Sequence, residues 1–191
     1  IGPKGFAAFF ESALAEVPSI EIRLHSLQAN EDTSEVLSGK YHACILPRET
    51  RQERKLDVHP LFRERFVLGC SANHPLAARE TVRGENLLEF PFVDRLKCEF
   101  RDQIFDHFAR RGALMQPRFR SDRDDWVQRV VADGHSICIL PERSAIAHGL
   151  VTRPIDGFVL EREVVMATVS GSTAPVEIRK IAHLAAGYAW S

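Results

Sequence analysis

The chain has 191 residues, enough for one large domain or two small ones that share a core. Hydrophobic residues make up 45% and charged residues 27%, and no apolar run is long enough to cross a bilayer, so the composition is that of a soluble globular protein. The 25 basic and 26 acidic side chains nearly cancel. This balance argues against DNA binding by these residues themselves, because neutralising phosphates requires a basic surface.

The first helix and strand patterns lie before residue 40. Residues 5–17 place apolar side chains at helical spacing, and Pro18 ends this helix. Residues 19–27 alternate between apolar and polar side chains, which predicts a strand. Residues 33–38 predict a short helix that Gly39 stops.

Two further strands are predicted before residue 75. The segment YHACIL, residues 41–46, is typical of a buried strand, and Pro47 ends it. The charged residues 48–56 predict a solvated loop, and a long strand follows from residue 60 until the Asn73-His74-Pro75 group breaks it. This order of helices and strands favours parallel strands that are joined by helices.

After Pro75 the alternation of strands and helices starts again. The expected elements are strand 90–94, helix 99–111, strand 117–122, helix 124–134, strand 136–142, strand 162–170 and helix 175–189.

Glycine and proline predict where several of these elements end. Gly112 should stop one helix, and Gly134 is expected in a left-handed conformation at the end of another. Pro175 lies near the first turn of the last helix, where its fixed backbone angle suits a helix start. The residues that mark the buried face of the helix from residue 124 are Trp126, Val127, Val130 and Val131.

The order of elements predicts an α/β fold with two Rossmann-like subdomains and a cleft between them. If the last strand and helix pack onto the first unit, two crossover segments join the lobes, around residues 70–76 and 151–157. Subdomain I then comprises residues 1–71 plus 157–191, and subdomain II comprises residues 72–156. In such folds ligands bind at the carboxyl ends of strands and at the N-termini of helices.

Five segments together resemble the effector-binding domain of LysR-type transcriptional regulators. They are ALAEVPSIEIRL (13–24), LSGKYHACI (37–45), HPLFRERFVLGCSANHPLA (59–77), VRGENLLEFPFV (82–93) and VVADGHSICILPE (130–142). The resemblance implies a periplasmic-binding-protein-like fold within a cytoplasmic regulator that forms a homodimer or homotetramer. It also implies that DNA is contacted only through an N-terminal winged helix-turn-helix domain, which we expect to be absent from this chain.

Three separate segments supply candidate residues for binding a small organic anion, most simply a carboxylate effector. They are the start of the first helix, the loop after strand 90–94, and the start of the helix at residue 124. Backbone N–H groups at helix starts favour anions, and basic side chains add charge-assisted contacts. The candidate effector-binding residues are Gly2, Pro3, Lys4, Arg95, Lys97, Cys98, Arg101, Ser121, Arg123 and Asp124.

Cys98 has three possible roles: redox sensing, lining the effector site, or packing. The peroxide-sensing branch of the resembled family carries a reactive cysteine in a similar place, followed by an Arg-Asp-Gln triplet. Here Arg101-Asp102-Gln103 follows one residue later, and His107 and Phe108 stand where that branch has its partner cysteine. An intramolecular disulfide at this spacing cannot form, so the sequence favours the effector site or packing.

Other classes of protein have less support. The chain has no GxSxG, HExxH, P-loop or dinucleotide motif, so we expect neither an enzyme nor a cofactor. The cysteines and histidines are scattered, which gives a metal site no support. The main rival is a solute-binding protein of a transporter, which would share the architecture. An upstream helix-turn-helix or an upstream signal peptide would discriminate between them.

Overall fold

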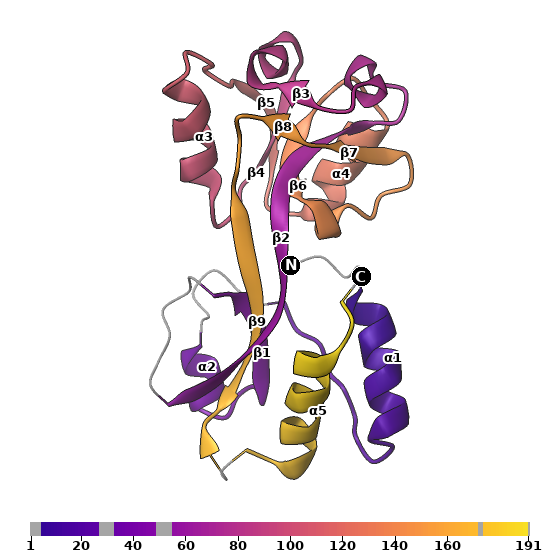
Figure 1. Ribbon diagram of the computed structural model, residues 1–191, viewed down its shortest axis with the longest axis vertical. Coiled ribbons are helices and arrows are strands. Elements are labelled where there is room, and N and C mark those ends of the chain that lie inside the picture. Colours follow the sequence, from indigo (N-terminus) through magenta and orange to yellow (C-terminus); the bar gives the residue numbers. More distant parts are fainter. Residues whose placement is uncertain (1–4, 27–32, 49–54, 172–173, 191) are drawn as a thin grey trace. The chain divides into compact units, whose positions relative to one another are not determined.

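The computed structural model describes residues 5–26, 33–48, 55–171 and 174–190, and these residues form two compact units (Figure 1). The first unit contains the chain up to Glu64 and again from Arg162, and the second contains Arg65–Glu161. The chain changes unit within two strands, β2 (Leu56–Ser71) and β9 (Glu161–Val169). Two strand crossovers therefore link the units, at 64/65 and 161/162.

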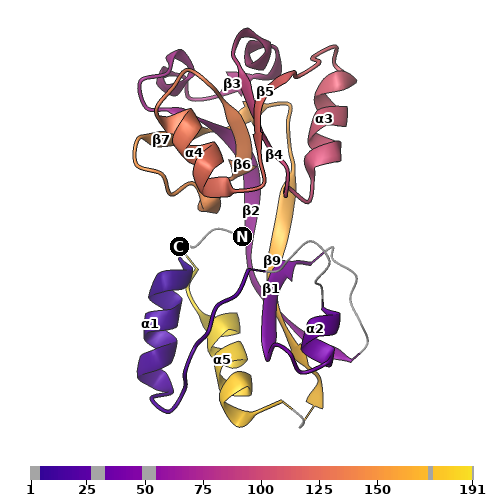
Figure 2. The same cartoon turned by 180° about the vertical axis from the view of Figure 1, so that it is seen from behind.

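The first unit is a sheet with helices on both faces (Figures 1 and 2). Its other elements are α1 (Phe6–Glu16), α2 (Ser34–Leu37), β1 (Ala43–Pro47) and α5 (Val176–Gly187). Strand β9 lies between β1 and β2 and pairs antiparallel with β1. Met166 packs with α1 and α5, whereas its neighbours Val165 and Ala167 pack with α2, because successive side chains of a strand point to opposite faces.

An aromatic cluster joins the end of the first unit to α1. The ring of Trp190 lies 4.8 Å from Phe6, 5.1 Å from Phe9 and 4.9 Å from Tyr188, measured between centroids. The Trp190 indole N–H donates to the Ala185 carbonyl oxygen at 2.9 Å, so its polar atom is paired. The apolar face of α1 thus forms one side of a core, and Tyr188 and Trp190 form another part of it.

The second unit contains the remaining elements. They are η1 (Pro75–Ala78), β3 (Val82–Arg83), η2 (Gly84–Glu89), β4 (Phe92–Arg95), α3 (Arg101–Ala109), β5 (Pro117–Ser121), α4 (Asp124–Ala132), β6 (Cys138–Pro141), η3 (Glu142–Ser144), β7 (Leu150–Arg153) and β8 (Ile155–Asp156). Strands β6 and β7 pair antiparallel with β2, whereas β4 pairs parallel with β5, and β3 with β8. Within the described ranges, the expected parallel pairing is found in these two short pairs and in an isolated parallel bridge between Phe92 and Ile137.

Three local expectations are wrong. Residues 20–26 form no strand, and β1, the end strand of its sheet in the described part of the chain, does not pair with them. Gly134 is not among the glycines with positive φ; the backbone turns after α4 through Asp133 instead. Trp126 is 54% exposed although Val127 and Val131 on the same helix are fully buried. Helical spacing predicted the buried face of this helix correctly at Val127 and Val131, but the buried face does not extend to Trp126.

His74 is a buried histidine that starts η1. Its side chain is 3% exposed, and its Nδ1 accepts a hydrogen bond from the Leu76 backbone N–H at 3.1 Å. Burial lowers the pKa of His74, an effect that outweighs the opposing contact with the backbone of His135. The folded protein therefore resists protonation of His74 more than the unfolded chain does.

The pKa of His74 predicts a loss of stability in mild acid. A lowered folded-state pKa contributes stability above the unfolded pKa of about 6.5, and this contribution is lost as the pH falls. We expect the melting temperature to fall between pH 7 and pH 5, and to fall less in His74→Asn, because asparagine can still accept at the start of η1. Thermal melts at both pH values measure this difference, and equal slopes for the two proteins would contradict it.

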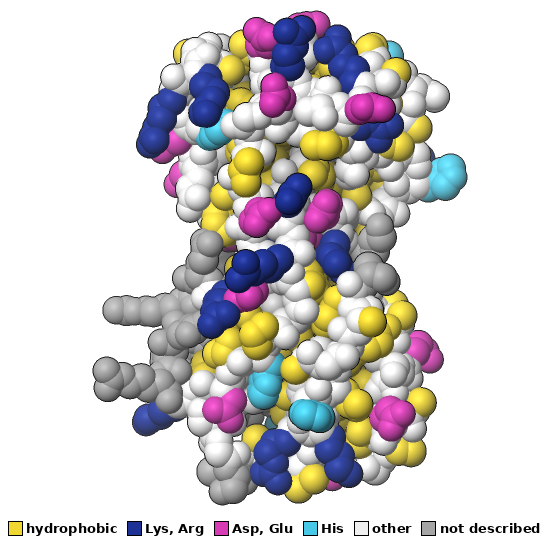
Figure 3. Space-filling view, viewed as in Figure 1, with side chains coloured by type: hydrophobic (Ala, Val, Ile, Leu, Met, Phe, Trp, Pro, Cys, Tyr) yellow, Lys and Arg dark blue, Asp and Glu magenta, His cyan; other side chains and the backbone are white. Residues whose placement is uncertain are grey.

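Basic and acidic side chains are interspersed on the face drawn in Figure 3. This pattern agrees with the near-equal numbers of 25 basic and 26 acidic residues in the sequence.

Candidate functional site

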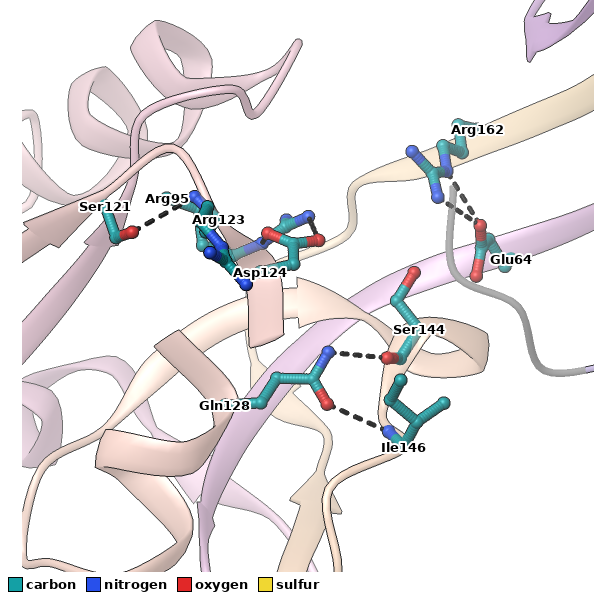
Figure 4. A network of polar contacts seen from close by, with 9 residues as sticks. All are labelled: Glu64, Arg95, Ser121, Arg123, Asp124, Gln128, Ser144, Ile146 and Arg162. Atoms are coloured by element: carbon teal, nitrogen blue, oxygen red, sulfur yellow. Dashed lines mark hydrogen bonds and ion pairs between the residues drawn. The ribbon is translucent and has the colours of Figure 1, made fainter. Parts of the chain in front are cut away.

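The candidate site lies where two parallel strands of the second unit end. Arg95 ends β4 and Ser121 ends β5, and the parallel register places these two residues opposite each other. Helix α4 begins at Asp124, and the Ser121 hydroxyl oxygen accepts from the Arg123 backbone N–H at 3.0 Å (Figure 4). Because parallel strands end at the same edge, residues 26 positions apart meet here, as the sequence predicted.

Arg95 is the most buried basic side chain of the site. It is 8% exposed, and its Nε and Nη2 donate to the two carboxylate oxygens of Asp124 at 2.9 and 2.7 Å (Figure 4). Burial disfavours the guanidinium charge, but the hydrogen bonds and charge of Asp124 outweigh it, so the pKa of Arg95 is raised. Its Nη1 is also buried and has no hydrogen-bond partner among the residues that the structure describes. One donor therefore remains for another acceptor.

The other predicted cations that the structure describes are also paired with aspartates. Arg101 forms a forked pair with Asp94, with Nη2 to Oδ2 at 2.7 Å, and this hydrogen bonding raises the pKa of Arg101. The remaining contacts are Lys97 with Asp122 at 3.6 Å and Arg123 with Asp125 at 2.6 Å. The site is therefore close to electrical balance, rather than an open cluster of positive charge.

Cys98 lies in the turn between β4 and α3. Its backbone N–H donates to the Arg95 carbonyl oxygen at 3.1 Å, and its own carbonyl accepts from Arg101 at 3.1 Å. Its side chain is half-buried and interacts electrostatically with the guanidinium groups of Arg95 and Arg101. These side chains and Asp94 line a cavity of about 10 Å³, which has room for about one water-sized molecule.

The four cysteines should differ strongly in reactivity. Cys44, Cys70 and Cys138 are buried, whereas Cys98 is half-buried. Burial raises the pKa of Cys138 to about 12, and it also raises that of Cys70, so both remain protonated at pH 8. We expect iodoacetamide at pH 8 to modify Cys98 first in the native protein. Peptide mapping by mass spectrometry checks the order, and faster labelling of any other cysteine would contradict it.

The structure brings together seven of the ten predicted site residues in one unit. These are Arg95, Lys97, Cys98, Arg101, Ser121, Arg123 and Asp124. Gly2, Pro3 and Lys4 lie outside the described residues, so their part in the site, like the inter-lobe cleft, stays a prediction.

Sequence reasoning missed Asp94. Its side chain is 2% exposed, and it holds Arg101 and lies 3.7 Å from Arg120. The signal was present in the segment FVDR, where a carboxylate ends an apolar strand. A buried carboxylate of this kind requires a cationic partner. Arg101 also lies over the ring of Phe105, 4.8 Å from its centroid, which fixes the guanidinium further.

Within the described ranges, no group of three or more His, Cys, Asp or Glu side chains is arranged to hold a metal ion. None of the helices in those ranges is both long and apolar enough to cross a membrane.

The chain matches one protein family over nearly its whole length. Residues 3–188 match the model of the LysR substrate binding domain. The chain therefore belongs to the family of LysR substrate-binding domains, and it has that family's periplasmic-binding-protein-like fold.

Individual relatives add detail. The chain is 32% identical over 132 residues to a hydrogen peroxide-inducible genes activator of Pectobacterium carotovorum, which covers 66% of this chain and 42% of that protein. The chain thus spans about two fifths of the length of the first curated relatives. It resembles the reduced OxyR regulatory domain of Pseudomonas aeruginosa, with a TM-score of 0.77, 20% identity and coverage of 98% and 93% of the two chains. It also resembles the CcmR regulatory domain of Synechocystis in complex with 2-PG, with a TM-score of 0.78, 18% identity and coverage of 95% and 89%.

Proposed function

We propose that this domain senses a small organic anion within a LysR-type transcriptional regulator. The regulator would contact DNA through a winged helix-turn-helix domain elsewhere in the full protein, act in the cytoplasm, and assemble as a homodimer or homotetramer. Binding would change DNA contacts only if the anion binds one arrangement of the regulator more tightly than another. The related CcmR domain, solved in complex with 2-PG, supports a small-molecule ligand for this fold.

The buried Nη1 of Arg95 is the observation that carries this proposal. The other two guanidinium nitrogens are held by Asp124, so the third is fixed in position without an acceptor among the described residues. An unmet donor on a buried charge is costly, and a carboxylate oxygen would satisfy it. Ser121 lies opposite Arg95 in the strand register, and α4 begins at Asp124. The cavity that Arg95 lines has room for about one water-sized molecule, so a carboxylate would have to widen it to reach this prepositioned cation.

Titration calorimetry with aliphatic and aromatic carboxylates tests the proposal. We expect at least one to bind the native chain, and Arg95→Lys to weaken that binding about tenfold or more, because lysine keeps the charge but loses the fork. Arg129→Lys is the matched control, since Arg129 on α4 forms an exposed pair with Asp133, the residue that follows this helix. Absence of binding across the panel at millimolar concentration would refute the proposal, as would equal effects of both substitutions.

A second candidate function is peroxide sensing by Cys98. It is favoured by the half-buried thiol beside two guanidinium groups and by relatives named as hydrogen peroxide-inducible activators. The thiolate sulfur would attack one peroxide oxygen and the O–O bond would break. Cys98 would be oxidised to sulfenic acid, and the peroxide would be reduced to water after the leaving hydroxide takes a proton.

Intact mass after mild peroxide treatment separates the two functions. Peroxide sensing predicts the gain of one oxygen at Cys98 before the other cysteines, and no gain in Cys98→Ser. If the native protein binds a carboxylate but is not modified by peroxide, peroxide sensing is excluded and anion sensing is supported.

A further inference from the structure

A second and larger cavity lies in the second unit and shares no lining residue with the cavity beside Cys98. Its volume is about 300 Å³, at the lower end of the range for small-molecule sites. Its walls come from the start of η2, the end of α3, and β8. The residues that carry charge are Arg83, Glu85, His107, Arg111 and Asp156.

Two opposite charges on these walls are left without ionic partners. Arg83 pairs with Glu85 at 3.4 Å. Arg111 instead contacts the ring Nδ1 and the carbonyl oxygen of His107, each at 3.3 Å. Within the described ranges, Arg111 has no carboxylate partner, and the side-chain carboxylate of Asp156 makes no hydrogen bond or ion pair. The cavity thus presents one guanidinium and one carboxylate that do not neutralise each other.

His107 adds no positive charge near neutral pH. Burial lowers its pKa, and the charges of Arg111 and Arg110 lower it further. Its ring is held edge-on against Phe158, with 4.9 Å between centroids. Since its Nδ1 faces the Arg111 guanidinium, His107 positions that group while leaving it uncompensated.

The floor of the cavity is apolar. Phe108 and Ala113 line it and are 1% and 5% exposed, and Leu88 forms part of the rim. Gly84 closes another side; a Cβ there would lie 3.2 Å from the Phe108 ring, so a larger residue would require that ring to shift by a few tenths of an ångström. An apolar floor beside two exposed, opposite charges suits a ligand that has the same three parts.

We propose that this cavity binds an α-amino acid with an apolar side chain. The ligand's carboxylate pairs with Arg111, its ammonium group pairs with Asp156, and its side chain packs on Phe108 and Ala113. A ligand with only a carboxylate would leave Asp156 unpaired, and a ligand with only an ammonium group would leave Arg111 unpaired. The zwitterion is therefore preferred over a ligand that carries one of the two charges. This site is separate from the proposed anion site at Arg95, so the domain could respond to a second small-molecule effector.

Nuclear magnetic resonance of the labelled chain, residues 1–191, tests the proposal with L-leucine as the probe. We expect leucine at millimolar concentration to shift amide signals from residues 84–88 and 107–113, with smaller changes at residues 95–98 and 121–124. The comparison compounds are 4-methylpentanoate, which lacks the ammonium group, and 3-methylbutylamine, which lacks the carboxylate. Each should bind at least tenfold more weakly than leucine.

Substitutions place the ligand in this cavity. Asp156→Asn and Arg111→Gln should each weaken leucine binding more than tenfold, while both proteins keep the native amide spectrum elsewhere. Glu80→Gln is the matched control, because Glu80 is exposed and does not line the cavity. The proposal is overturned if leucine at 10 mM shifts no signals, if a single-charge compound binds equally well, or if Glu80→Gln has the same effect.

Discussion

Replacing Glu64 by leucine should lower the free energy of unfolding by about 3–5 kcal/mol, the largest effect we expect from one substitution. Glu64 and Arg162 are 1% and 2% exposed at their side chains, and Arg162 Nε donates to Glu64 Oε1 at 2.7 Å (Figure 4). The substitution removes the carboxylate that faces Arg162 and leaves its charge buried. Urea unfolding of the single variant measures the loss.

Two further variants show whether the buried charge is the cause. The double variant Glu64→Leu with Arg162→Met should recover most of the lost stability, since an apolar pair replaces both charges. Arg65 and Glu161, the next residues on the same two strands, form an exposed pair at 2.9 Å, 72% and 42% exposed. Glu161→Gln should therefore cost less than about 1 kcal/mol. A loss below about 1 kcal/mol for Glu64→Leu itself would contradict the interpretation.

Replacing Gln128 by methionine should cost about 3 kcal/mol, because it removes three hydrogen bonds at about 1 kcal/mol each. Gln128 is 4% exposed on α4, and its Nε2 donates to the Ser144 carbonyl oxygen at 2.7 Å. Its Oε1 accepts from the backbone N–H of Ile146 at 2.9 Å (Figure 4) and from that of Ala147 at 3.1 Å. One side chain thus fixes the whole turn after η3.

Hydrogen exchange distinguishes this role from simple loss of packing. In Gln128→Met, the amides of residues 146 and 147 should exchange faster than in the native protein, whereas the centre of β6 should change only as global stability falls. Gln103→Met is the matched control, because Gln103 is exposed on α3, and it should change stability by less than about 0.5 kcal/mol. Unchanged protection at residues 146 and 147 would rule out the proposed role.

The pairing of cations with aspartates changes what the candidate site can recognise. Five basic side chains were expected to attract an anion by their combined charge, yet the four that the structure describes each face an aspartate. If the site binds an anion as proposed, recognition would depend on a few fixed donors, above all Arg95 Nη1, rather than on net charge. This favours selective binding of one ligand geometry over general attraction of anions.

The sequence by itself determined the features that repeat along the chain or depend on neighbouring residues. Apolar spacing placed α1 and α5, the alternation of β9 placed its side chains on two faces, and Pro175 lies just before α5 as expected. The family resemblance, confirmed by the match over residues 3–188, supplied the fold class. These signals are local, or they come from the order of segments, so they can be read without coordinates.

Only the tertiary structure decided which distant side chains form pairs. Arg95 and Asp124 are 29 positions apart and Glu64 and Arg162 are 98 apart, and no periodicity in the sequence specifies either pair. The same holds for residues 20–26, whose alternation predicts a strand although β1, the end strand of its sheet in the described chain, does not pair with them. A strand and an ion pair each need a partner from elsewhere in the chain, and the fold alone brings that partner within a few ångströms.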